Sequence, residues 1–175
     1  MTQFEESIQH DLHRYLLMEQ EIDERLPDAP DIEEKWESIA EAYMPDGISE
    51  FNANPIVPLG WIMYVGMAIA KFWDTEWQKY GTIENIYLYL RDKRGYDAMD
   101  DFIREEVLEL QGDAFNALER LVGECASRTY SQLRHASFEP GTKDSFNAFV
   151  ECLHQLYLMG ASVQLKRMGY RMTKM

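Results

Sequence analysis

The sequence predicts an all-α fold, a single-domain bundle of about seven helices over residues 1–175, packed around a buried central helix near Pro58–Tyr80. Three observations lead to this prediction. Apolar residues recur at spacings of three and four along most of the chain, no stretch alternates apolar and polar residues over a strand length, and one long segment is apolar on all sides. A helix that is apolar all round is either a buried central helix or a membrane span.

The central helix is expected within Pro55–Tyr80, which carries three of the four tryptophans and no charged residue from Pro55 to Ala70. A membrane span needs about 20 mostly apolar residues, so this shorter uncharged run favours a core helix and no membrane partner. Gly66 lies in its middle and is expected to let a neighbouring helix approach closely. We therefore expect Gly66→Leu to destabilise the protein by overpacking, and Gly66→Ala to be near neutral.

Six further helices are expected around the central one. Their ranges are 3–26, 31–43, 83–94, 97–110, 115–136 and 144–168. Proline and glycine set most of the boundaries: Pro27 and Pro30 end the first helix, Pro140 and Gly141 precede the last, and a turn at residues 44–47 ends the second. Residues 48–57 are then expected to be mostly loop.

The charge of the chain is strongly acidic and unevenly distributed. With 31 acidic and 17 basic residues the net charge is -14, and residues 1–60 alone carry 15 acids against 3 bases. An acidic body argues against nucleic acid and against an anionic membrane as partners. The basic tail Lys166, Arg167, Arg171 and Lys174 is expected to complement the end of the last helix or the acidic N-terminal part of the same chain.

The two cysteines, Cys125 and Cys152, both lie among apolar residues at helical spacing. Buried, reduced thiols are therefore expected, since a metal or redox pair would need a closer motif. The N-terminus is acidic and lacks the apolar segment of a signal peptide. Together these features favour a cytoplasmic protein.

Motifs that would define an enzyme class are missing from the sequence. It has no phosphate-binding loop, no dinucleotide-binding glycine motif, no serine nucleophile elbow, no H-E-x-x-H and no C-x-x-C. The sequence therefore indicates no cofactor, and the first hypothesis is a non-enzymatic protein-binding module. One version is an inhibitor, immunity-type or regulatory protein whose acidic surface covers a basic protein partner.

Two series of carboxylates are spaced four residues apart on expected helices. The first series is Glu33, Glu37 and Glu41, and the second is Asp97, Asp101, Glu105 and Glu109. Like charges at this spacing disfavour an isolated helix by about 0.2–0.5 kcal/mol per pair. Each series is either a solvated face whose cost core packing offsets, or an acidic face offered to a basic partner.

A group of aromatic residues follows the apolar part of the central helix. Trp73, Trp77 and Tyr80 are expected on one helical face, with Asp74 and Glu76 beside them. Aromatic residues at helical spacing usually belong to a core. Here the helix is becoming polar, and tryptophan flanked by acids is typical of a groove that binds a cationic or aromatic group.

The alternative hypothesis is a metal-binding helical bundle or a metal-dependent enzyme. Glu151 and His154 form one E-x-x-H motif, whereas di-iron bundles use two such motifs with two further glutamates. His10 and His13, also three residues apart, could supply half of a metal site. Both spacings are, however, more often those of ordinary surface or hydrogen-bonded pairs than of metal ligands.

Overall fold

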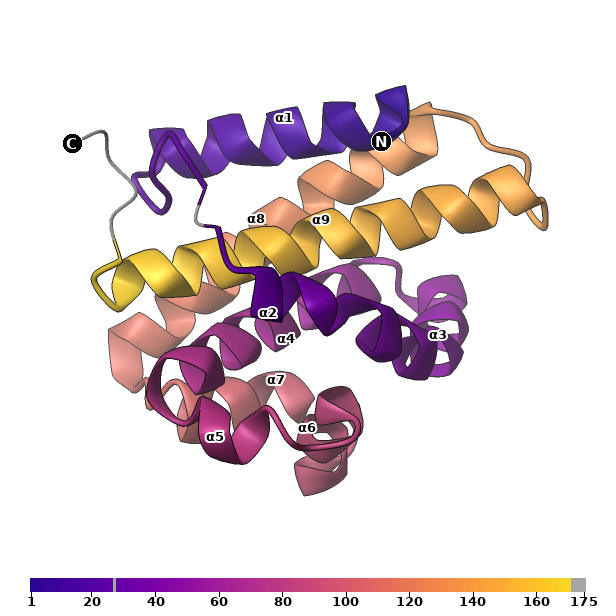
Figure 1. Cartoon of the computed structure of the whole chain (residues 1–175). Helices are drawn as coiled ribbons and strands as arrows, with labels where there is room; N and C mark the ends of the chain where they lie inside the picture. Colours follow the sequence, from indigo (N-terminus) through magenta and orange to yellow (C-terminus); the bar gives the residue numbers. More distant parts are fainter. Residues whose placement is uncertain (27, 171–175) are drawn as a thin grey trace.

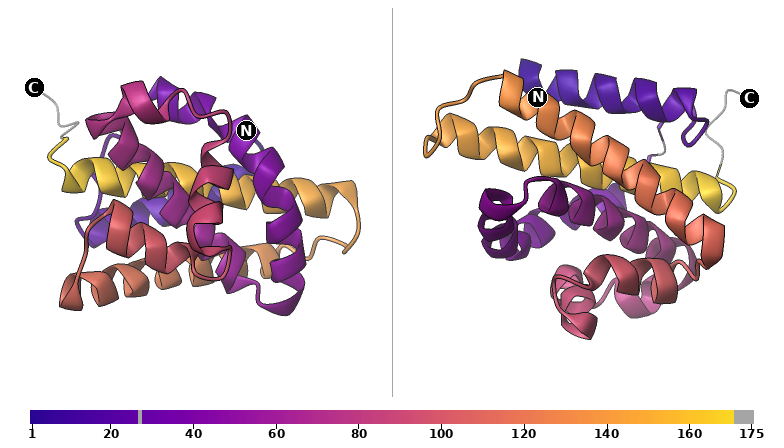
Figure 2. Two further views of the ribbon diagram at one scale, coloured as in Figure 1. Left: turned by 90° about the horizontal axis from the view of Figure 1, so that it is seen from below. Right: turned by 180° about the vertical axis from the view of Figure 1, so that it is seen from behind.

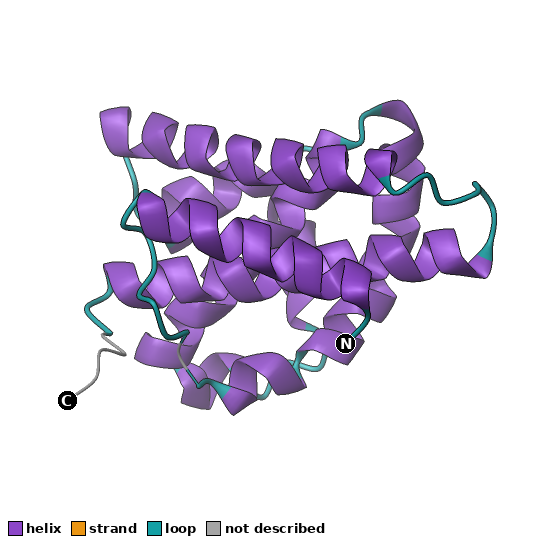
Figure 3. Cartoon of the chain, turned by 90° about the horizontal axis from the view of Figure 1, so that it is seen from above, coloured by secondary structure: helices purple, strands orange, loops and turns teal. Residues whose placement is uncertain are grey.

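The computed structural model describes residues 1–26 and 28–170, and within these ranges the chain is all-helical (Figures 1 and 3). Nine α-helices and one π-helical segment are found there. They are α1 (Gln3–Met18), α2 (Pro30–Glu34), α3 (Trp36–Ala53), α4 (Ile56–Thr75), α5 (Trp77–Tyr80), α6 (Ile86–Arg94), α7 (Met99–Phe102), the π-helical segment η1 (Ile103–Val107), α8 (Gly112–His135) and α9 (Lys143–Arg167). The predicted fold class, a multi-helix bundle around a central helix, is confirmed.

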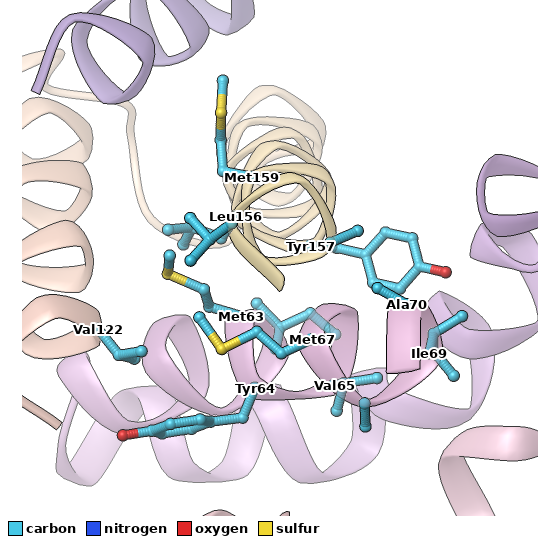
Figure 4. Close-up of a cluster of buried hydrophobic side chains, with 14 of the residues drawn as sticks. Met63, Tyr64, Val65, Met67, Ile69, Ala70, Val122, Leu156, Tyr157 and Met159 are labelled. Carbon is cyan, nitrogen blue, oxygen red and sulfur yellow. The ribbon is translucent and has the colours of Figure 1, made fainter. Parts of the chain in front are cut away.

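Helix α4 is the centre of the bundle. Every residue from Leu59 to Ala70 except Trp61 is buried, because α9, α8 and α3 pack around it, and α9 makes the most extensive of these contacts (Figures 2 and 4). Among the described helices α4 alone is long and apolar enough to cross a membrane, yet 72% of its apolar window is buried inside the bundle. Its apolar surface is therefore covered by protein, as expected for a core helix.

Helices α4 and α9 approach each other through glycine. A Cβ atom built on Gly66 would lie 2.1 Å from the carbonyl oxygen of Tyr157, and one built on Gly160 would lie 2.2 Å from the carbonyl oxygen of Met63. Backbone atoms on both helices therefore occupy the space that a side chain would need. The close approach predicted for Gly66 is confirmed. Because even a methyl group would collide with backbone, the structure predicts that Gly66→Ala is destabilising and not near neutral.

Two of the predicted helices are each divided in two. The central helix does not run from Pro58 to Tyr80; it begins at Ile56 and ends at Thr75, where Glu76 leaves the helical conformation with φ -146° and ψ 39° and α5 begins. The helix predicted over 31–43 is interrupted at Lys35, between α2 and α3. These short breaks turn the chain without any proline or glycine at the break itself, so the sequence pattern did not reveal them.

The first helix ends eight residues earlier than predicted. After Met18 the chain reverses through Gln20, which adopts φ 61°, and the amide of Glu21 donates to the carbonyl of Leu16 while the amide of Gln20 donates to Leu17. This is the Schellman arrangement, with glutamine in the position that glycine usually fills. Ile22 lies beyond this turn and is buried. Its helical spacing from the preceding apolar residues therefore reflects a loop that packs on the core, not a continuing helix.

Helix α3 continues through Pro45 to Ala53, so the predicted turn at 44–47 and the predicted loop at 48–57 are wrong. Proline removes one helical hydrogen bond, the one to the carbonyl of Glu41. Glu41 and Pro45 are both exposed, so water can satisfy that carbonyl. Asp46 then anchors the helix, because it accepts hydrogen bonds from the hydroxyl of Tyr87 at 2.6 Å and from Arg91 at 2.8 Å.

The expected helix over 97–110 forms as α7 and the π-helical segment η1, on which Arg104 is 2% exposed. Its guanidinium donates to Asp100 at 3.0 Å, Asp101 at 2.9 Å and Glu119 at 3.1 Å. It also lies 3.9 Å from the ring centroid of Phe115. Through these contacts the buried arginine links α7 and η1 to α8.

The basic tail interacts with the acidic N-terminal part where the structure describes it. Lys166 lies 3.3 Å from Asp23, and Arg167 lies 2.8 Å from Glu21. Arg171 and Lys174 lie outside the described residues. Cys125 and Cys152 are both buried and unpaired, as predicted.

Candidate functional site

A hollow of about 320 Å³ lies between the end of α4, the short helix α5, α6 and the π-helical segment. We call it the acidic–aromatic hollow. It is lined by Lys71, Phe72, Thr75, Glu76, Tyr80, Tyr89, Phe102, Glu106, Val107 and Glu109. Four aromatic rings and three carboxylates thus surround one space, and three of these seven side chains come from two groups that the sequence predicted separately. Glu76 and Tyr80 belong to the aromatic group, and Glu109 to the second carboxylate series.

The aromatic wall of the hollow is built on a stacked pair. The rings of Phe72 and Tyr80 lie 3.8 Å apart between centroids and 12° from parallel, and the Tyr89 ring stands edge-on to Tyr80 at 5.7 Å. The break at Glu76 makes this possible, since it turns α5 back so that Tyr80 folds onto Phe72. Burial raises the pKa of the Tyr80 hydroxyl, so this wall stays neutral at physiological pH.

The same rings already accept ammonium groups of the chain. Lys79 lies 4.9 Å from the ring centroid of Tyr80, and Lys93 lies 4.4 Å from that of Tyr89. Both are cation–π distances. These two tyrosine rings are therefore within reach of cations, although one face of Tyr80 stacks on Phe72 and Lys79 already lies over the ring.

The carboxylates of the hollow differ in how they are paired. Glu106 lies 3.3 Å from Arg94, which also lies 3.0 Å from Glu105. Glu76 and Glu109 are exposed, and neither forms an ion pair or a side-chain hydrogen bond with a described residue. Tyr80 and, to a lesser degree, the charge of Glu76 nevertheless raise the pKa of the neighbouring Lys79. Two exposed carboxylates beside an aromatic wall favour a positively charged guest.

The two tryptophans of the predicted aromatic group lie outside the hollow, and both are half-buried. Trp73 donates from its indole nitrogen to Asp31 on α2 at 3.1 Å, and Lys35 lies 5.7 Å from the ring centroid of Trp77. Asp74 is exposed and accepts a hydrogen bond from the hydroxyl of Tyr170. The break at Glu76 therefore separates Trp73 and Asp74 from Trp77 and Tyr80, which a continuous helix would have kept on one face.

The first carboxylate series does not form one uniform face. Glu33 lies on α2, and its carboxylate is 3.2 Å from Nε2 of His154 without the alignment of a hydrogen bond. Glu37 and Glu41 lie one turn apart on α3, are exposed, and have no charged partner among the described residues. Two of the three residues thus remain available to a partner.

The second carboxylate series is also divided. Asp101 is paired with Arg104 and Glu105 with Arg94. Asp97 and Glu109 are exposed, but a π-helical segment lies between them, and Glu109 adopts φ 56° beyond it. The spacing of four residues therefore does not place the series on one continuous helical face.

The predicted metal-ligand candidates are dispersed. Glu151 accepts a hydrogen bond from Thr2 at 2.7 Å, while Nδ1 of His154 lies 3.4 Å from Glu5. His13 contacts the carbonyl of Glu24 at 2.8 Å, and His10 is exposed on the same helix. Within residues 1–26 and 28–170, no three or more His, Cys, Asp or Glu side chains are arranged to hold a metal ion.

Sequence reasoning missed a second and larger hollow, of about 600 Å³, between the end of α3, the end of α8 and the start of α9. We call it the aromatic groove. It is lined by Ile48, Phe51, Asn52, Tyr130, Leu133, Arg134, Phe138, Pro140, Gly141, Thr142, Ser145, Phe146 and Phe149. The residues from α3 were expected to be loop, although the spacing of Ile48, Phe51 and Asn52 already fits one helical face.

Comparison with known proteins adds no assignment, because no family model, no curated protein and no solved structure matches this chain.

Proposed function

We propose that this protein is a non-enzymatic binding module that recognises a basic protein partner through the acidic–aromatic hollow. The observation that carries the proposal is the meeting of Tyr80 with two exposed carboxylates, Glu76 and Glu109, around one hollow. Aromatic rings and carboxylates together recognise a lysine or arginine side chain, the rings through their faces and the carboxylates through charge.

The size of the hollow suits one side chain better than a large ligand. Its volume of about 320 Å³ is at the lower end of the range usual for small-molecule sites. A protruding lysine or arginine of a partner would fill it, and the surface around it would complete the interface. Exposed, unpaired acids such as Glu37 and Glu41 on α3 support the same proposal, because the net charge of -14 steers a basic partner toward the molecule.

The proposal is tested by affinity purification from the native cell at low and high salt, with retained proteins identified by mass spectrometry. We expect a retained protein of high isoelectric point that is released as salt is raised, because steering and ion pairing are both screened. The double variant Glu76→Gln/Glu109→Gln should retain much less of it. The double variant Glu139→Gln/Asp144→Asn is the matched control, since it removes two exposed charges elsewhere and should behave like the parent.

Two results would count against the proposal. One is retention of no basic protein at low salt. The other is equal loss of the partner in both double variants, which would show that total charge matters and that the hollow does not.

A further inference from the structure

The aromatic groove is formed at the opposite end of the molecule from α5 and the acidic–aromatic hollow. In Figure 1 the connection between α8 and α9, which forms one wall of the groove, lies at the right, whereas α5 lies at the lower left. The groove is therefore independent of the proposed function, and its occupancy can be tested separately.

The floor of the groove is made of aromatic rings in tilted and edge-on contact. Phe51 lies 4.9 Å from Phe149 and 6.1 Å from Tyr130 between ring centroids. Phe138 makes an edge-on contact with Phe4 of α1, at 5.2 Å between ring centroids and 87° between ring planes. Each of these rings therefore packs against another ring of the protein.

The rim exposes apolar surface that the protein itself does not cover. Phe146 is 47% exposed and Ile48 is 43% exposed, and they face the groove from α9 and from α3. Seven large apolar side chains are exposed among the described residues, and two of them meet at this hollow. Two exposed apolar side chains at one hollow favour a ligand with an apolar body over a polar protein surface.

The polar groups of the groove define the charge of the ligand. Arg134 is the single charged residue among the described residues that line it. Its guanidinium lies 5.9 Å from the ring centroid of Tyr130 and has no ion pair or hydrogen bond with any described residue. The side chains of Asn52 and Ser145 likewise have no hydrogen-bond partner there, so they can add neutral polar contacts.

From this we propose that the aromatic groove binds a small amphiphilic molecule with an apolar body and one anionic headgroup, which Arg134 holds. The volume of about 600 Å³ lies in the middle of the range usual for small-molecule sites. The guanidinium is suited to a carboxylate or sulfonate because it offers two parallel N–H donors. The surrounding rings bury the apolar body.

The test uses 1-anilinonaphthalene-8-sulfonate, a fluorescent aromatic monoanion, and its uncharged analogue N-phenyl-1-naphthylamine, with the full chain. We expect saturable binding of the anionic dye to one site. Arg134→Gln should weaken the anionic dye about tenfold and leave the uncharged dye unchanged, since it removes one charge-assisted contact. Phe146→Ser should weaken both dyes, because it removes apolar wall.

Matched controls keep the result specific to the groove. Arg120→Gln removes an exposed arginine earlier on α8, and Leu88→Ser removes a side chain that is 41% exposed on α6. Neither should change binding. Each variant is compared with the parent by near-UV circular dichroism, because this dye also binds partly unfolded chains. If Phe146→Ser loses near-UV structure, Ile48→Ser replaces it.

Two results would overturn the proposal. Anionic-dye binding that neither Arg134→Gln nor the apolar variants change would place the dye elsewhere. Equal weakening of both dyes by Arg134→Gln would mean that the arginine shapes the groove without selecting an anion.

Discussion

Replacement of Gly66 by alanine tests the close contact between α4 and α9. In the parent, the backbone of α9 at Tyr157 and Ala161 lies directly against Gly66. A methyl group there would lie 2.1 Å from the carbonyl oxygen of Tyr157, whereas ordinary contact begins at 3.4 Å. A flexible side chain could rotate away, but this neighbour is backbone inside a helix, so the two helices would have to move apart.

The magnitude follows from two opposing terms. Alanine in place of glycine inside a helix ordinarily stabilises by up to about 1 kcal/mol. Overpacking of a well-packed core costs about 1–3 kcal/mol and occasionally more. The collision involves backbone at the most extensive helix–helix contact of the bundle. We therefore expect a cost of overpacking in the upper part of that range. The net loss should be about 2 kcal/mol or more, which for a chain of this size lowers Tm by roughly 4–8 °C.

Urea-induced unfolding, followed by far-UV circular dichroism, measures this change in the free energy of unfolding. Gly123→Ala is the matched control: Gly123 lies inside α8, and a Cβ atom there would meet nothing within 4 Å. That variant should gain about 0.5–1 kcal/mol from helix propensity. Gly160→Ala should be destabilised like Gly66→Ala, and the double variant should cost less than their sum, because helices already forced apart leave room for the second methyl group.

A Gly66→Ala protein that unfolds at the same urea concentration as the parent, or at a higher one, would refute this reasoning. Such a result would mean that α9 does not pass over position 66 at the described distance. The arrangement around α4 would then have to be revised, whatever the behaviour of Gly123→Ala.

Two further predictions concern buried polar groups. Arg104→Ala should cost about 3 kcal/mol in urea unfolding, because it leaves the half-buried carboxylate of Asp100 without its partner, while Arg120→Ala, at an exposed position, should change stability by less than about 0.5 kcal/mol; similar values for the two would contradict the buried network. Burial raises the pKa of the Cys125 thiol from 9.0 to about 12 and raises that of the Tyr157 hydroxyl above its usual value of 10.0. These groups keep their protons in the folded protein after the unfolded chain has lost them, so the free energy of unfolding should be insensitive to them below pH 9 and fall as pH rises from about 9 toward 12. Unfolding in urea at a series of pH values measures this, and a stability that rises over that interval would be inconsistent with buried neutral groups.

Much of the fold could be predicted because helical periodicity and apolar runs report burial directly. The central helix is the clearest case, because an uncharged helix that is apolar on all sides is either buried in a protein core or spans a membrane. Each of the seven expected helices corresponds to helical structure in the described part of the chain. The close contact at Gly66 could also be foreseen, since a glycine in the middle of a buried helix usually marks a near neighbour.

The features that the sequence did not predict have local causes, which the spacing of apolar residues does not reveal. Gln20 takes the position that glycine normally fills, so the end of α1 lacked its usual marker. The sequence predicts a helix end at Pro45, but tertiary contacts of Asp46 stabilise α3 beyond it. Because the residues of α3 after Pro45 form one wall of the aromatic groove, the sequence did not predict the groove either.

The candidate site could be predicted only in part. Tyr80, Glu76 and Glu109 were each identified as candidates, but in two unrelated groups, and their meeting at one hollow depends on the break at Glu76 and the π-helical segment before Glu109. Neither irregularity has a strong sequence signal. The pairing of Arg94 and Arg104 with neighbouring acids, which divides the second carboxylate series, likewise depends on tertiary structure.

The most direct test of the proposed function is the dissociation constant of the purified basic partner, measured by calorimetry near physiological salt for the parent and the two double variants. Glu76→Gln/Glu109→Gln and Glu139→Gln/Asp144→Asn remove the same amount of charge from exposed positions. A specific cationic contact in the hollow predicts about tenfold weaker binding for the first variant and less than twofold for the second. Equal affinities in the two variants would contradict it.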